Sequence, residues 1–425
     1  MRHRIATWRM AGLAGSVLAL VGLAGLAQEG GLRSTLTLSQ GVEAAQNPSL
    51  STGEEDSLRE ARVGLGYTLE TRTRTEALRF SARGDVRAAS DEAGVDVARP
   101  ELALRYSRAA PRLALALDVA ARQSDLRVLD ATALARDTDG ALTVPSDLDD
   151  LEGAGTRTDL RFSARATLDE ERPVSVTVGL AGQRLSYAGT TAPGLVDRTR
   201  LALDLEARFA LSRVTRVEAG LGFGTVEEDG AAAREIATLR AGVQSARSAR
   251  LVARAGVDLA FPEAGRDRAT LLAGVTHRLS PLSELSFDAG VTLIDGADAE
   301  PVYRARLVHA LSRRLEADAR LQREVTSPDG QETTVSTGAL LGLDLTLTPL
   351  SQVSLDATLL RQGDIETDAR TTRLALSSTY RRALTEDWSA AMGLRLSARE
   401  TGTGARASSE ALFLRFERRW QTRGR

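Results

Sequence analysis

The chain has 425 residues and a formal net charge of −2. It contains no cysteine and no lysine, so arginine supplies its basic charge. A nearly balanced charge argues against a nucleic-acid-binding protein, which needs a basic face. The lack of cysteine suits a chain that crosses an oxidising compartment without forming disulfides. Beyond the first thirty residues, no apolar run is long enough for a membrane-spanning helix.

The first residues have the pattern of an export signal. Arg2, Arg4 and Arg9 precede the apolar run from Met10 to Ala27, which ends in small residues before Gln28. A basic start, an apolar run and small residues at the cleavage position are typical of a signal peptide. We therefore predict a signal peptide over residues 1–27, with an uncleaved membrane anchor as the alternative, and one further domain over residues 28–425.

From Leu32 onward, apolar and polar residues alternate with a period of two, which indicates β-strands with one apolar face. In the second predicted strand, one face carries Ala61, Val63, Leu65, Tyr67 and Leu69, and the other carries Arg62, Gly64, Gly66 and Thr68. Several of these alternations persist for roughly 9 to 13 residues, near the length that crosses a bilayer at a tilt. The blades of a propeller use shorter strands, of about 5 to 6 residues.

Short turns and longer polar loops separate these runs in alternation. Turns such as Leu279-Ser280-Pro281 and Leu347-Thr348-Pro349 recur at intervals of roughly 32 to 40 residues, which is one hairpin plus its outer loop. The longer loops are mostly acidic, and the longest runs from residue 124 to 153. Short turns on one side and long loops on the other are typical of an outer-membrane barrel.

The stretch from Thr333 to Leu360 is the clearest hairpin. Leu341, Leu343 and Leu345 alternate with Gly342 and Asp344, a tight turn follows, and the alternation resumes to Leu359. We predict an all-β fold: a membrane-spanning, up-and-down antiparallel β-barrel of about 20 strands, within a range of roughly 18 to 22, with both chain ends on the periplasmic side. The apolar face should meet lipid, because open sheet edges are costly in hydrocarbon.

The last predicted strand carries Leu412, Leu414, Phe416 and Trp420 on one face. It resembles the aromatic-ended closing strand of proteobacterial porin-like outer-membrane barrels, although five residues follow Trp420. This resemblance covers the architecture of the whole mature chain. It implies the outer membrane of a Gram-negative bacterium, contact with outer-membrane lipid and passage through the barrel-insertion machinery, and it allows a homo-oligomer.

The polar face is expected to line a lumen that is too wide for side chains to fill. The predicted pore-lining residues are arginines: Arg79, Arg83, Arg105, Arg161, Arg165, Arg208, Arg240, Arg304 and Arg306. They would favour anionic or zwitterionic solutes. The alternative is that they pair with carboxylates on neighbouring strands and only hydrate the wall.

The long loop over residues 124–153 is the third outer loop and is rich in carboxylates. In many general porins the third loop folds inward and narrows the pore, so the resemblance implies the same role here. The candidate constriction residues are Asp137, Asp139, Asp147, Asp149 and Asp150. An acidic surface loop is the alternative. A calcium site is not expected, because Asp137 and Asp139 lack the remaining ligands of a calcium loop.

No catalytic, metal or cofactor site is predicted. His277 and His309 precede short turns on the periplasmic side, where interfacial roles fit better than catalysis. The predicted function is therefore that of a porin-like channel for passive diffusion of small polar solutes, with mild anion preference and without enzyme activity. Two alternatives are a barrel that serves export or assembly of a surface polysaccharide or protein, and an outer-membrane hydrolase.

Overall fold

The structure is a computed structural model that describes residues 31–52, 56–90, 96–128, 131–136, 141–151, 153–170, 172–190, 192, 194–327, 333–366 and 370–423. The predicted signal peptide over residues 1–27 lies outside these residues. Within the part of the chain that the structure describes, no helix has the length and apolar character needed to cross a membrane.

Twenty strands form one antiparallel sheet in which each strand pairs with its neighbours along the chain. The first ten are β1 (Arg33–Gln46), β2 (Ser57–Arg72), β3 (Glu76–Ala89), β4 (Asp96–Ala110), β5 (Leu113–Asp125), β6 (Thr156–Leu168), β7 (Val174–Ala188), β8 (Arg198–Ala210), β9 (Thr215–Glu228) and β10 (Arg234–Ala246). The others are β11 (Leu251–Pro262), β12 (Arg268–Ser280), β13 (Ser283–Ile294), β14 (Glu300–Ala310), β15 (Leu315–Thr326), β16 (Thr334–Thr348), β17 (Ser351–Asp364), β18 (Arg370–Ala383), β19 (Trp388–Glu400) and β20 (Arg406–Arg423).

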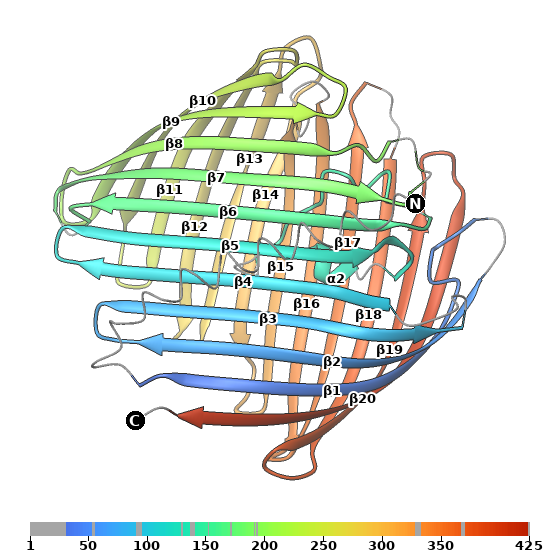
Figure 1. Ribbon diagram of the computed structural model, residues 1–425. Coiled ribbons are helices and arrows are strands. Elements are labelled where there is room, and N and C mark those ends of the chain that lie inside the picture. The colour runs from blue at the N-terminus through green and yellow to red at the C-terminus, as the bar shows by residue number, and fades with distance from the viewer. Residues whose placement is uncertain are drawn as a thin grey trace.

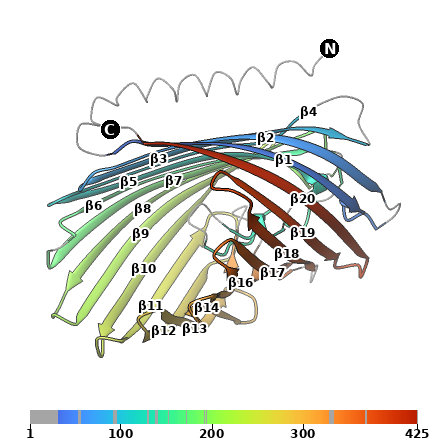
Figure 2. The same cartoon turned by 90° about the horizontal axis from the view of Figure 1, so that it is seen from below.

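The sheet closes on itself because β1 pairs with β20 as well as with β2. The register at this seam runs from Arg33 opposite Arg423 to Gln46 opposite Glu410. In Figure 1, β2 to β9 cross the front of the molecule and β12 to β19 run steeply across them behind, as tilted strands of a barrel do. Figure 2 shows the two walls enclosing an interior. The predicted all-β barrel of about twenty strands is confirmed.

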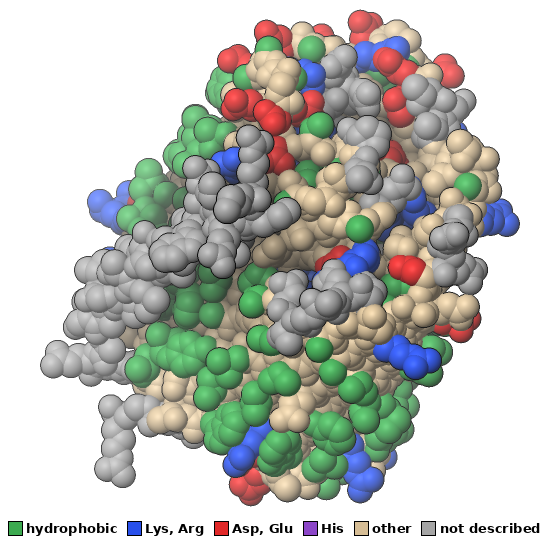
Figure 3. Space-filling model, turned by 45° about the vertical axis from the view of Figure 1, so that its right-hand side comes forward, with side chains coloured by type: hydrophobic (Ala, Val, Ile, Leu, Met, Phe, Trp, Pro, Cys, Tyr) green, Lys and Arg blue, Asp and Glu red, His purple; other side chains and the backbone are tan. Residues whose placement is uncertain are grey.

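The alternation of the sequence separates an inner from an outer face on every strand. In β16, Leu341, Leu345 and Leu347 point outward and are 39%, 36% and 42% exposed, whereas Ser336 and Leu340 on the inner face are buried. Figure 3 shows hydrophobic side chains gathered over the lower part of one face and charged side chains gathered at its upper end. A closed cylinder with an apolar exterior satisfies its backbone in hydrocarbon, and this chain is an outer-membrane barrel of a Gram-negative bacterium.

Aromatic side chains mark the short-turn end of the exterior. Trp388 and Trp420 lie on the outer face of β19 and β20, and the guanidinium of Arg418 lies 5.5 Å from the ring centre of Trp388 and 4.7 Å from that of Trp420. Amphipathic rings with a cation stacked on them are typical of the boundary between hydrocarbon and headgroups.

The outer face makes a testable prediction about stability. Leu341→Arg, near the middle of β16, should destabilise the barrel by about 2–4 kcal/mol, because it places a charge in hydrocarbon. Thr346→Arg on the lumen face of the same strand is the control and should have little effect. Reversible urea unfolding in lipid vesicles measures both, and equal losses in the two variants would contradict the assignment of faces.

Candidate functional site

A long segment between β5 and β6 enters the barrel and reaches the opposite wall. We call residues 126–155 the lumen loop; it contains a 3-10 turn (Leu126–Val128) and the short helix α2 (Ala131–Leu134). The hydroxyls of Thr132 and Thr358 lie 3.2 Å apart, and Arg136 forms an ion pair of 3.1 Å with Asp356. Figure 1 shows α2 in front of β17, and Figure 2 shows this segment between the two walls. The lumen loop therefore crosses the lumen.

An apolar cluster fixes the loop on the far wall. Ala135, Leu142 and Leu148 of the loop pack with Leu340 of β16 and Leu360 of β17, and all five are buried. Gly338 makes room for this contact, because a Cβ at that position would meet Leu142 at 3.2 Å. Burial of a leucine side chain stabilises by roughly 1.5–3 kcal/mol, so this cluster is a substantial part of the docking energy.

A buried ion pair fixes the loop on the near wall. Asp147 accepts two hydrogen bonds from Arg157 of β6, at 2.6 and 3.3 Å, and a third from the hydroxyl of Tyr187 of β7. Arg157 also donates to Asp159, at 3.2 Å. Burial opposes ionisation of the Asp147 carboxyl, but Arg157 and the hydrogen bonds outweigh it and keep the pKa of Asp147 below its ordinary value.

Asp149, two residues further along, is in a less favourable setting. Burial is the main cause that raises its pKa to about 6, and the neighbouring Asp150 adds to the rise. The Thr371 hydroxyl and the charges of Arg399 and Arg373 act in the opposite direction. Arg399 also donates to the backbone carbonyl of Asp149, at 3.1 Å. The docked loop therefore holds one carboxylate that favours docking and one that opposes it at neutral pH.

The remaining predicted constriction residues have different surroundings. Asp150 lies against Gly194, where a Cβ would overlap its carboxylate. Asp137 and Asp139 lie outside the described residues. The three described aspartates are thus held in contacts within the barrel, and their part in conduction stays a prediction.

The predicted pore-lining arginines lie on the inner faces of their strands, and most of them have a carboxylate within 4 Å. The pairs are Arg79 with Glu70, Arg105 with Asp118, Arg161 with Asp159, Arg208 with Glu206, Arg240 with Asp204 and Asp258, and Arg304 with Glu324. Within the described part of the chain, Arg83, Arg165 and Arg306 have no such partner. The contribution of these side chains to solute passage stays a prediction.

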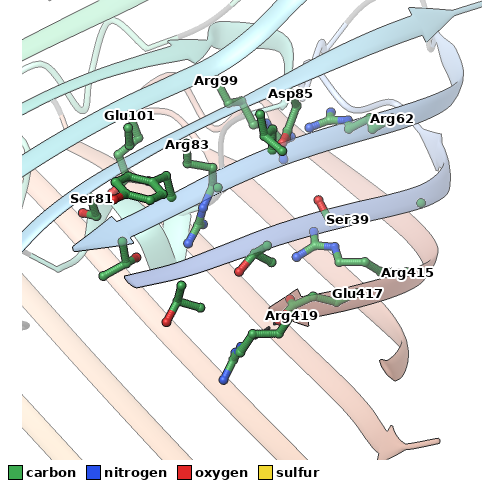
Figure 4. Close-up of a pocket in the computed structure, with 18 of the residues that line it drawn as sticks. Ser39, Arg62, Ser81, Arg83, Asp85, Arg99, Glu101, Arg415, Glu417 and Arg419 are labelled. Carbon is green, nitrogen blue, oxygen red and sulfur yellow. Dashed lines mark hydrogen bonds and ion pairs between the residues drawn. The ribbon is translucent and has the colours of Figure 1, made fainter. Parts of the chain in front are cut away.

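Two of the cavities lined by described residues are large and open inside the barrel. One, of about 630 Å³, is lined by loop residues 143–146 and by β6 to β10, with Arg161, Arg200 and Arg240 among its side chains. The other, of about 640 Å³, lies over β1 to β4 and β20 and is rich in arginine (Figure 4). We call the second one the arginine pocket. No group of three or more His, Asp or Glu side chains that could hold a metal ion occurs among the residues described.

The apolar anchors on the inner wall were not anticipated from the sequence. Leu340 and Leu360 point into the lumen, whereas the alternation places leucines toward lipid. Both occur in doublets, Leu340-Leu341 and Leu359-Leu360, which interrupt the period of two. A leucine on the wet face of a barrel needs an internal partner, so such doublets are the signal that could have pointed to a docked loop.

Comparison with known proteins gives matches only among solved structures; no family model and no curated protein matches. The siderophore receptor PirA from Pseudomonas aeruginosa is 8% identical, with a TM-score of 0.46 over 92% of this chain and 80% of that chain. The copper transporter OprC is 11% identical, with a TM-score of 0.47, and the match covers 92% of this chain and 80% of that chain. The FrpB iron transporter from Neisseria meningitidis is 8% identical, with a TM-score of 0.44, and the match covers 94% of this chain and 82% of that chain.

The predicted role as a passive, porin-like channel is wrong. The similar structures are receptors and transporters for siderophores or metals rather than passive porins. The structure adds that the lumen loop crosses the interior and packs on the opposite wall against Leu340 and Leu360.

The buried ion pair makes the next prediction. Asp147→Asn should loosen the lumen loop by roughly 1–3 kcal/mol, because it removes a charged partner of buried Arg157, which keeps only Asp159. Limited trypsin digestion at pH 7.5 measures this as faster cleavage after Arg136. Asp298→Asn, at an exposed carboxylate in the β13–β14 loop, is the control. Equal protection of Arg136 in both variants would show that the ion pair does not hold the loop.

The raised pKa of Asp149 predicts that docking of the lumen loop depends on pH. This raised pKa means that the docked state binds the proton more tightly than the released state, so the contribution of Asp149 to docking is complete below pH 3.8 and is lost as the pH rises through about 6. Asp147 has the opposite sign, and its contribution is lost only at lower pH. Hydrogen exchange of residues 141–151, corrected for intrinsic rates, should therefore slow by roughly tenfold from pH 7.5 to 5. Asp149→Asn should abolish this dependence; a pH response retained by that variant would assign it to another group.

Proposed function

We propose that this barrel is a gated outer-membrane transporter for small polar solutes, and that the lumen loop is its gate. The observation that carries the proposal is the docking of the loop on β16 to β19, at the side of the barrel remote from the strands that hold its ends. A barrel of twenty strands has a lumen too wide for wall side chains to fill, so an inserted segment decides whether solutes pass.

The chemistry of the lumen supports a solute-carrying role. The inner wall bears interleaved arginines and carboxylates, such as Arg240 with Asp204 and Asp258, and these side chains are about half exposed. Such a wall is hydrated and offers charged groups of both signs to polar solutes. The two cavities, of about 640 and 630 Å³, are large enough for small polar molecules.

The contacts of the loop favour the hypothesis of a movable gate and argue against a permanent plug. They include two apolar clusters, one with Leu340 and Leu360 and one in which Leu126 and Leu151 pack with Leu195, together with several polar contacts. Among the polar contacts is that of Asp149, whose ionisation opposes docking at neutral pH and so favours release of the loop from the wall.

A reversible cross-link tests the gate. The hydroxyls of Thr132 and Thr358 are 3.2 Å apart, and cysteine would place a sulfur near each hydroxyl position, so the double variant Thr132→Cys with Thr358→Cys should form a disulfide that locks the loop on β17. The natural chain has no cysteine, so no other pairing competes. Each single cysteine variant is a control.

Ion current through planar bilayers is the measurement. The oxidised double variant should be silent, and reduction should restore the intermittent openings of the natural protein. Replacement of residues 131–151 by a short glycine-serine linker should give a large steady conductance. A locked variant that conducts like the natural protein would refute the gate, and a linker variant that stays silent would refute transport through the lumen.

A further inference from the structure

The arginine pocket carries an excess of positive charge. Nine arginines and five carboxylates line it, an excess of four positive charges. Most of its carboxylates already have cationic partners: Glu417 pairs with Arg419 at 3.2 Å, Glu70 with Arg79 at 3.4 Å and Glu43 with Arg395 at 3.2 Å. Arg62 pairs with Glu60 outside the pocket, whereas Arg83, Arg99 and Arg415 have no carboxylate within 4 Å among the described residues.

Strand register gives the pocket a floor between two cationic edges. Across the sheet, Arg83 of β3 stands opposite Gly66 of β2, Gly66 opposite Thr37 of β1, and Thr37 opposite Arg419 of β20. Two strands with small side chains thus separate the arginines of β3 and β20, a distance of roughly 14 Å for three strand spacings. Figure 4 shows Arg83 on one side of this floor and Arg415 and Arg419 on the other.

The cations at both edges are available to a ligand. Among the described residues, neither Arg83 nor Arg415 has a hydrogen bond or a carboxylate within 4 Å. An irregularity between β3 and β4 adds a third cation: the register shifts after Arg83, Arg99 has a φ of 50°, and its side chain lines the pocket. A bulge that re-aims a side chain at a site is a recurrent feature of functional sheets.

We propose that the arginine pocket is the binding site for a small solute that carries two or more oxyanion groups. Guanidinium forks bind carboxylates and phosphates through paired hydrogen bonds, and the hydroxyls of Thr37, Ser39 and Ser81 add donors on the floor and at its edge. One oxyanion group meets Arg83 and Arg99, and the other meets Arg415. The inference rests on the proposed transport function, for which it names the class of solute.

Isothermal titration calorimetry of the purified barrel in detergent at low ionic strength tests the site, with citrate and inorganic pyrophosphate as separate probes. If only citrate binds saturably, the solutes are polycarboxylates. If only pyrophosphate does, they are phosphorylated solutes. If both bind, the pocket is a general site for polyoxyanions. Affinity should fall with added salt, because the contacts are charged. The neutral sugar maltose should not bind.

Variants localise the binding. Arg83→Gln with Arg415→Gln should weaken it by roughly tenfold or more. Arg304→Gln with Arg306→Gln removes as much positive charge from the lumen face of β14, outside the pocket, and should leave the affinity unchanged. Gly66→Leu fills the floor without changing charge and should also abolish binding; a Cβ there makes an ordinary contact of 3.6 Å with Thr37, so the strand accommodates the substitution.

The inference would be overturned if neither probe binds, or if the Arg83→Gln/Arg415→Gln variant binds a probe with the same affinity as the natural protein. Because no loop residue lines the pocket, equilibrium binding is measured independently of the gate. Binding in a protein whose locked loop does not affect current would refute the proposed gate and keep the site. A gated current in a protein that binds neither probe would refute the site and keep the proposed gate.

Discussion

The structure depends on the requirement that no backbone amide or carbonyl remain unpaired in hydrocarbon. Each such group costs several kcal/mol, so a sheet that spans a membrane must have no edge. The pairing of β1 with β20 meets this requirement, and the other features follow from closure. Every strand acquires one face toward lipid and one toward the lumen, and leucines occupy the first while arginines, aspartates and glycines occupy much of the second.

Closure also creates a protected interior in which a loop can behave as a small core. The lumen loop uses the same two devices that stabilise soluble proteins, a leucine cluster and a buried hydrogen-bonded ion pair. Its energetics are mixed, because Asp147 favours the docked state while Asp149 opposes it above pH 6. In the proposed function, this balance is what lets the loop act as a gate rather than as a permanent part of the wall.

The sequence predicted the barrel well because strand alternation is a local signal. Residues such as Leu341, Gly342 and Leu343 report their faces without knowledge of any partner, and the short turns mark each hairpin. The arginines of the lumen face were placed for the same reason. The site was harder to predict because its contacts are distant along the chain: Thr132 meets a residue 226 positions away, and Arg399 meets one 250 positions away. The acidic composition of the long loop suggested an inward fold only through the resemblance to porins, and it gave no indication of the residues that the loop would contact. Arg99 enters its pocket through an irregularity that simple alternation cannot anticipate.

The long reach of the lumen loop has a consequence for biogenesis. The loop lies between the fifth and sixth strands, but the far wall that receives it belongs to the sixteenth to nineteenth strands, which begin only at Thr334, much further along the chain. Until those strands are in place, Leu142 and Leu148 have no hydrophobic acceptor inside the nascent wall. Docking is therefore a terminal event of maturation, and its stabilisation is gained only by a cylinder that is already complete.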